Sequence, residues 1–185
     1  MLDSPSFTLP EHDRPGEIMV TPWSYQSLGV PLIATGQAPS SQNFVTANLA
    51  VFIPFAVPEP CVLTRLFWMN GAAVAGNLDA GVYDTAGTRL VSTGTTGQLN
   101  TSQVQSVDVT DTVLARGVYY LALASDTSCA TQKVHAVVPA ASIPQGLGLL
   151  QMAAAFVLPA SATFAIYTSA YIPVVGAQMY RTYAP

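Results

Sequence analysis

Side chains that could carry out chemistry are few in this chain. Its two histidines are His12 and His135, and no GxSxG motif occurs. Nucleophilic catalysis needs a nucleophile, a base within hydrogen-bond reach and a group that orients the base. His12 lies in a proline-rich segment, and His135 lies in a β-rich run where a side chain facing water is the simplest interpretation. The sequence therefore predicts no catalytic residue and no enzymatic activity.

Paired carboxylates could hydrolyse a glycosidic bond, but this chain offers few of them. The glutamates are Glu11, Glu17 and Glu59, and Glu59 is flanked by two prolines in a predicted turn. The aspartates lie mostly at strand ends or next to turns, where such residues usually bind local backbone amides. We expect that local role for Asp79, Asp84, Asp108, Asp111 and Asp126.

Calcium is the metal to consider, because it takes six to eight oxygen ligands. Asn77, Asp79 and Asp84 at one turn could meet Asp108 or Asp111 from another, although no EF-hand spacing is present. The sequence gives stronger support to local hydrogen bonding, so no metal site and no cofactor are predicted.

The two cysteines, Cys61 and Cys129, form neither a metal motif nor a CxxC pair. They are interpreted as small apolar residues.

Charged residues are absent from two long stretches. Neither the 41 residues from Ile18 to Pro58 nor the 45 residues from Ala136 to Tyr180 contain Asp, Glu, Lys, Arg or His. Charged residues make up 9% of the chain, against about a quarter in an average soluble domain. A chain of this size still exposes roughly a third of its unfolded surface after folding. We therefore expect these stretches to fill a large core and also to face another protein.

Net charge and segment length exclude two classes of partner. A formal charge of −4 opposes nucleic-acid binding, which requires a basic surface. A membrane-spanning helix needs about 20 consecutive apolar residues, and prolines interrupt both uncharged stretches. The first residues, MLDSPSFTLPEHDRP, are acidic and proline-rich and unlike a signal peptide, so synthesis in the cytoplasm is expected.

Residues 1–42 are predicted to form an extended arm. Prolines recur there at intervals that prevent a helix of useful length, yet the segment is rich in large apolar residues, in which disordered chains are poor. Such an extended segment suits binding along a surface, its own or a neighbour's. The predicted partner-binding anchors are Trp23, Tyr25, Leu32 and Ile33.

Residues 43–185 are predicted to form one all-β domain, a jelly-roll-like antiparallel β-sandwich. Short β-rich runs separated by Gly, Asn, Asp, Ser and Thr clusters are typical of a sandwich or barrel. Pro54 predicts an edge or a bulge within its run, because proline cannot donate to a strand ladder. The expected strands are Leu49–Val57, Val62–Asn70, Asp79–Asp84, Arg89–Ser92, Gln103–Val109, Gly117–Ser125 and Val134–Val138.

Several of these runs are apolar on both faces, whereas a two-layer sandwich should leave one face of each sheet polar. Examples are Val51–Ile53, Leu66–Met69 and Val118–Ala124. Their outer faces must be covered by the arm, by the C-terminal segment or by a second subunit. The elements expected in that C-terminal segment are a short helix at Leu147–Phe156 and strands at Ala162–Tyr167 and Ala170–Val175.

Glycan binding is the alternative function, because β-sandwiches often bind sugars with exposed aromatic residues. Aromatic residues in strands are more commonly part of a core or an interface, and packing is the expected role of Trp68 within its apolar run. A fold alone cannot assign a ligand. The aromatic residues considered are Trp23, Trp68, Tyr83, Tyr119 and Tyr120.

A resemblance to a known group extends over roughly residues 44–176. Residues 49–55 read LAVFIPF, 64–71 TRLFWMNG, 76–84 GNLDAGVYD, 90–94 LVSTG, 107–112 VDVTDT, 117–122 GVYYLA, 151–156 QMAAAF and 158–160 LPA. This series is similar to a group of small β-rich virion proteins of tailed bacteriophages.

The resemblance implies a non-enzymatic structural protein of the virion, made in the host cytoplasm. Its partners would be other virion subunits, as capsid decoration, at the head–tail joint or in a fibre, and it would form a homo-oligomer. Obligate interfaces are large and apolar and poor in Lys and Glu, which agrees with the uncharged stretches. The alternative is a module on the phage particle that binds a host-surface glycan.

Overall fold

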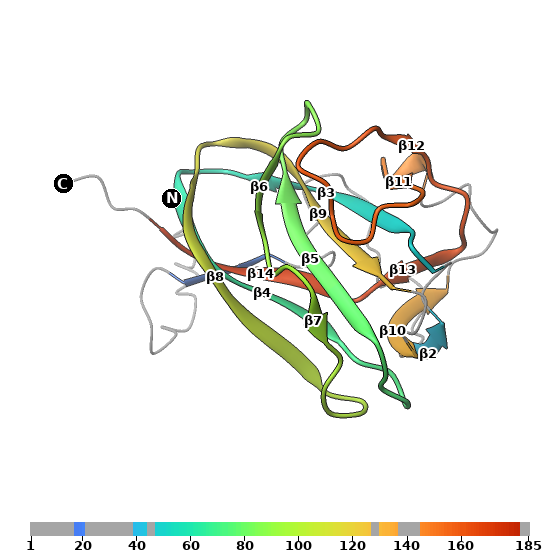
Figure 1. Ribbon diagram of the computed structural model, residues 1–185. Coiled ribbons are helices and arrows are strands. Elements are labelled where there is room, and N and C mark those ends of the chain that lie inside the picture. Colours follow the sequence, from blue (N-terminus) through green and yellow to red (C-terminus); the bar gives the residue numbers. More distant parts are fainter. Residues whose placement is uncertain (1–16, 21–38, 44–46, 127–129, 137–144, 182–185) are drawn as a thin grey trace, which may run out of the picture.

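The computed structural model describes residues 17–20, 39–43, 47–126, 130–136 and 145–181. The predicted all-β antiparallel sandwich is confirmed (Figure 1). Its strands are β1 (Glu17–Val20), β2 (Ser40–Asn43), β3 (Ala50–Val57), β4 (Cys61–Met69), β5 (Asn77–Tyr83), β6 (Arg89–Ser92), β7 (Thr96–Gly97), β8 (Val104–Leu114), β9 (Gly117–Ser125), β10 (Thr131–Ala136), β11 (Leu150–Met152), β12 (Ala165–Ile166), β13 (Tyr171–Pro173) and β14 (Val175–Arg181).

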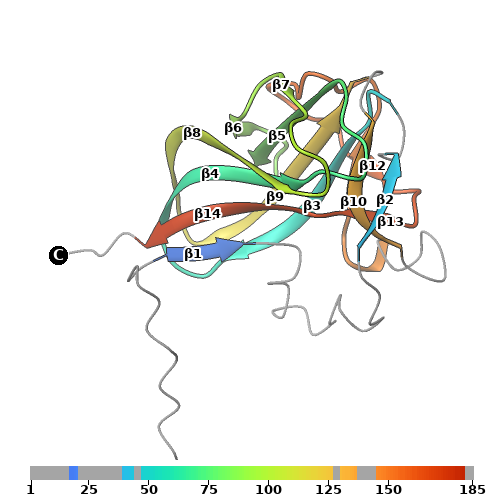
Figure 2. The same cartoon turned by 90° about the horizontal axis from the view of Figure 1, so that it is seen from below.

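These strands form three antiparallel sheets. The first sheet has the order β1-β14-β4-β8, and the third has the order β13-β10-β2. The second sheet has the order β12-β11-β3-β9-β5-β6, with β7 paired to β5. The first and second sheets pack on each other around the main core, and Figure 2 shows β1, β14, β4 and β8 side by side in one layer.

Alternate residues of each strand build this main core. Val51, Ile53 and Phe55 of β3 enter it from the second sheet, and Leu66 and Trp68 of β4 enter it from the first. Each of these side chains is at most 2% exposed, so the predicted packing role of Trp68 is confirmed. Burying one such side chain stabilises the fold by about 1.5–3 kcal/mol. If the pairing of a strand shifted by one residue, its buried side chains would turn to the opposite face of the sheet. The burial of these side chains therefore fixes the strand register.

The opposite face of the second sheet is also apolar, and the chain itself covers it. Residues 153–164, here called the strap, join β11 to β12 and lie against β3, β9 and β5 (Figure 1). Ala155 and Leu158 of the strap form a second core with Phe52, Tyr83 and Ala122 of the sheet. Of the three covers expected from the sequence, the C-terminal segment therefore covers this sheet.

The floor of this second core is made of small residues. Ala50, Ala122, Ala124 and Gly81 lie in paired positions of β3, β9 and β5. A Cβ at Gly81 would lie 3.0 Å from Leu158 Cδ1 and 2.9 Å from the carbonyl oxygen of Val91. These small residues let the strap approach the backbone of the sheet closely.

The predicted short helix at Leu147–Phe156 is wrong. Leu150–Met152 forms strand β11, which pairs with Ala50, Val51 and Phe52 of β3. A short apolar run does not distinguish helix from strand, and here pairing with β3 decides the outcome.

The sequence predicted an edge or a bulge at Pro54, and on one side of β3 the pairing does end before this residue. β3 pairs with β9 along its whole length, but β11 reaches only as far as Phe52. Pro54 therefore lies where β3 has become an edge on the β11 side, so its missing N–H breaks no ladder there.

Strand boundaries agree closely with the sequence in the central part of the chain. β6 and β9 have the predicted bounds, whereas β8 continues beyond the predicted end at Val109 to Leu114. Ser40–Asn43 forms β2 and pairs with β10, so it crosses the expected boundary between arm and sandwich.

Candidate subunit-contact site

The four predicted anchors, Trp23, Tyr25, Leu32 and Ile33, lie outside the described residues, as does His12. The described parts of the predicted arm are β1, at the edge of the first sheet, and residues 39–42, which include most of β2. The sequence suggested an extended segment here but not a strand with a definite partner. A run of four residues without a flanking hairpin signal gives too little pattern to identify one.

β1 is added along one edge of β14. Its register runs antiparallel from Glu17 opposite Tyr180 to Val20 opposite Ala177. The partners of Ile18 and Val20 are Met179 and Ala177, whose side chains are at most 1% exposed in the main core. Main-chain hydrogen bonds hold an added strand, and alternate side chains give it specificity. The outer edge of β14 is therefore a strand-binding site, and the arm occupies it.

β14 is itself firmly held on its other side. It pairs with β4 from Val175 opposite Trp68 to Arg181 opposite Cys61, with a register shift between Gln178 and Met179. Cys61, the free cysteine in the described part of the chain, is fully buried and donates to Met179 Sδ at 3.4 Å. Burial, together with the nearby Glu59 carboxylate, raises the pKa of the Cys61 thiol, so its predicted apolar role is supported.

The outer face of the first sheet carries both charged and apolar side chains. Arg65 of β4 lies opposite Asp108 of β8, and their Nη1 and Oδ1 atoms are 3.6 Å apart. Exposed and less exposed residues alternate along most of β8, and its Val104 and Val113 are 59% and 69% exposed. Phe67 of β4, by contrast, is only 9% exposed. This face therefore combines solvated and apolar positions.

The aspartates proposed as calcium ligands do not converge. Asp84 Oδ1 accepts from the backbone N–H of Ala86 and of Thr88, at 2.9 and 2.8 Å, which is the local role expected from the sequence. Asp126 accepts from Asn77, and Asp108 pairs with Arg65 on the other sheet. Within the described ranges, no three His, Cys, Asp or Glu side chains gather as a metal-binding group.

Asp79 differs from the other carboxylates because it is completely buried where the strap crosses β5. Its Oδ2 accepts from the backbone N–H of Leu158 at 3.0 Å, and its Oδ1 accepts from Thr93 Oγ1 at 3.3 Å. Burial raises the pKa of Asp79, although these hydrogen bonds and the nearby Arg89 oppose the rise. Its main donor lies 79 positions away in the sequence, so no local signal could have revealed this role.

Two neighbours complete this clamp on the strap. The Arg89 guanidinium donates to the carbonyl oxygen of Leu158, and the Tyr83 hydroxyl donates to that of Pro159 at 2.6 Å. Thr88 and Ser161 form an isolated bridge beside them. Together with Asp79, these contacts fix the strap through its backbone.

A buried amide network closes one end of the sandwich. Trp68 Nε1 and Gln98 Nε2 both donate to Asn70 Oδ1, at 3.0 and 3.2 Å. Asn70 Nδ2 donates to Gln105 Oε1 at 2.9 Å, and Gln98 Nε2 also donates to the carbonyl oxygen of Thr131 at 2.9 Å. Buried polar groups require such partners, and here they tie Gln98 and the starts of β8 and β10 to the end of β4.

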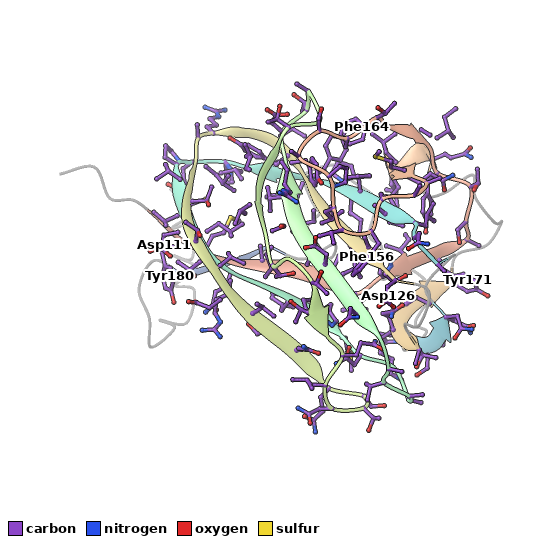
Figure 3. All side chains as sticks on the ribbon, viewed as in Figure 1. Asp111, Asp126, Phe156, Phe164, Tyr171 and Tyr180 are labelled. Carbon is purple, nitrogen blue, oxygen red and sulfur yellow. The ribbon has the colours of Figure 1, made fainter. Side chains whose placement is uncertain are left out.

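Most of the aromatic residues considered for glycan binding are engaged inside the protein. Trp68 and Tyr83 are fully buried, and Trp23 lies outside the described residues. Tyr119 donates its hydroxyl to the carbonyl oxygen of Ala115 at 3.0 Å. The ring of Tyr120 packs 4.9 Å from that of Phe164, which Figure 3 shows above Phe156 on the strap side of the second sheet.

His135, the second candidate imidazole, lies in β10 opposite Ile172. No helix among the described residues is long and apolar enough to cross a membrane. Comparison with known proteins identifies no relative: no family model, no curated protein and no solved structure matches this chain.

Proposed function

We propose that this chain is a non-enzymatic structural subunit of a tailed-phage virion, located in the particle and bound to other virion subunits. The observation that carries the proposal is the arm strand β1, bound along the edge of β14. A sheet that accepts an added strand makes a contact through its backbone, and such a contact needs no catalytic group.

Composition supports the same proposal. Only 9% of the residues are charged, and the formal charge is −4. Among the described residues, several large apolar side chains are exposed, including Val104 and Val113 on β8. Few charges and exposed apolar side chains suit a protein that buries surface against neighbours. The resemblance of residues 44–176 to small virion proteins supplies the class of assembly.

Light scattering on the purified full-length chain tests the association that the proposal requires. We expect an oligomer, or a mass that rises with protein concentration. A single-copy species at the highest attainable concentration would overturn the proposal.

A density gradient tests the location. Particles from a lysate that contains the protein are separated from soluble proteins, and each fraction is probed for the chain. We expect the chain to sediment with intact particles in a fixed ratio to the main shell protein. Its recovery in the soluble fractions alone would contradict a place in the virion.

A further inference from the structure

We infer that β1 is exchanged between copies, so that Glu17–Val20 of one chain pairs with β14 of a second copy in the assembly. This inference rests on the proposed function and names the partner at the same site. β1 is the outermost strand of the first sheet, and β14 is the strand to which it is hydrogen-bonded. Moving β1 to the β14 of a second copy would therefore break only its pairing with its own β14.

A second copy is the occupant that fits this edge. It carries the same four residues, so it can repeat the register from Glu17 opposite Tyr180 to Val20 opposite Ala177 without altering a contact. Exchange of an identical element between protomers therefore costs little in interaction energy. Any other protein would need a strand with its own match to Ala177 and Met179, which are buried in the main core.

The connection to the rest of the chain is long enough for exchange. Nineteen residues separate Val20 from Ser40, where β2 begins. At most about 3.5 Å per residue, they span up to about 65 Å. A compact domain of this length has a radius of gyration of about 16 Å. These nineteen residues carry no charge, so they meet no direct repulsion from a neighbour of net charge −4.

The local concentration of β14 edges decides whether β1 pairs with β14 of its own chain or with β14 of a second copy. A tether that can span the distance gives its own strand an effective concentration of up to the millimolar range. In dilute solution β1 therefore pairs within its own chain. Subunits packed side by side present neighbouring β14 edges at a comparable local concentration, so exchange becomes accessible on assembly.

Cross-linking between two variants, each with one introduced cysteine, tests the exchange. One chain carries Met19→Cys, the other carries Gln178→Cys and a mass tag, and the two are co-expressed at full length and cross-linked at a concentration where light scattering shows the oligomer. Met19 and Gln178 are paired in register, so a short bismaleimide joins them where β1 lies on β14. Each chain carries only one of the two positions, so a specific link must connect different copies. The unsubstituted chain, with native Cys61 and Cys129, gives the background.

A matched control uses Met19→Cys with Thr110→Cys. Thr110 is an exposed residue on β8 in the same sheet, at the edge opposite β1. We expect a mixed dimer with position 178 and loss of that product with position 110. Equal products from both mixtures would overturn the exchange, because random collision would then explain the link.

The doubly substituted chain completes the test. The inference is wrong if the chain with both Met19→Cys and Gln178→Cys links only within itself while the mixed variants give background. In that case β1 pairs with β14 of its own chain. Should neither the double variant nor the mixture link, β1 does not lie on β14, which also overturns the inference. An oligomer seen by light scattering in either case would leave the proposed function standing.

Discussion

The outer face of the second sheet is covered by the chain itself, whereas the outer face of the first sheet is partly exposed. On the second sheet, the strap buries Phe52, Tyr83 and Ala122 beneath Leu158. On the first sheet, β8 leaves Val104 and Val113 exposed and pairs Asp108 with Arg65 near the surface. The second sheet is thus the middle layer of three, whereas the first sheet is an outer layer with an added strand at its edge.

This difference explains where the uncharged residues go. Many apolar residues of the stretch from Ala136 to Tyr180 are buried within the same chain, including Leu158, Tyr167, Ile172 and Val175. The chain's own cores therefore take up much of this stretch, while contact with a partner stays a prediction. Most exposed strap residues, such as Ala153, Ala160 and Thr163, are small, and Val157 is the larger exception. Contact with other subunits is better sought at the first sheet.

The largest expected effect comes from opening the covered face. Leu158→Ala removes a fully buried side chain from above Gly81. We expect the free energy of unfolding to fall by about 2–5 kcal/mol, because a cavity adds to the lost burial. Chemical denaturation measures this change. Val157→Ala is the matched control, since Val157 is 45% exposed, and its cost should stay within about 0.5 kcal/mol. Equal losses from both variants would show that the strap does not cover the sheet.

A smaller loss is expected from Asp79→Ala. The substitution removes the acceptor of the buried Leu158 N–H, while the Thr93 hydroxyl keeps the carbonyl oxygen of Gly94. Leaving a buried donor unsatisfied costs about 1–3 kcal/mol, again measured by chemical denaturation.

Asp79→Asn is the control for charge, because an amide oxygen can still accept from Leu158. The folded protein raises the pKa of Asp79. The contribution of Asp79 to stability is therefore fully present below its pKa in the unfolded chain, which is about 4. This contribution is lost as the pH rises through the pKa of Asp79 in the folded protein. The wild type should thus lose stability relative to Asp79→Asn across that interval. A difference that does not change with pH would contradict this.

Removing the arm strand should affect stability less and assembly more. Deletion of residues 1–20 uncovers the edge of β14 but leaves both cores in place. The lost hydrogen bonds are offset by the entropy of ordering four residues, so we expect a loss below about 2 kcal/mol. Light scattering should show loss of the oligomer.

The length-matched control replaces residues 17–20 of the full chain with Gly-Ser-Gly-Ser. If this variant assembles as the wild type does, β1 is not the part of the arm that matters.

The smallest effect is expected on the exposed face. Asp108→Asn removes an ion pair whose side chains are 42% and 79% exposed, so the free energy of unfolding should change by less than about 0.5 kcal/mol. The difference should disappear at high salt. A large loss that persists in salt would mean that this face is more buried than the isolated chain shows.

The central strands could be predicted because their signal is local. Arg89–Ser92 and Gly117–Ser125 are β-rich runs between turn residues, and their bounds match β6 and β9. The need for a second cover was also visible, since β3 and β9 are apolar on both faces. The cover itself was not visible, because the strap is held by contacts such as Leu158 to Asp79, which join residues 79 positions apart.

The candidate site was predictable only in outline. The sequence indicated an arm with the capacity to bind along a surface, and Glu17–Val20 lies along β14. The edge that receives it depends on the order of the sheet, which brings β14, the last of the described strands, beside β1. No spacing within the arm encodes that neighbour. The anchors Trp23, Tyr25, Leu32 and Ile33 remain predictions.

Pro54 has a consequence for how the flank of β3 is closed. It is buried, and a Cβ at Gly148, just before β11, would lie 3.4 Å from its Cγ. Because proline has no N–H to donate to a ladder, this flank is closed by packing and not by backbone pairing. A strand from another molecule therefore meets neither an open surface nor a donor at Pro54, and edge-to-edge growth is hindered there.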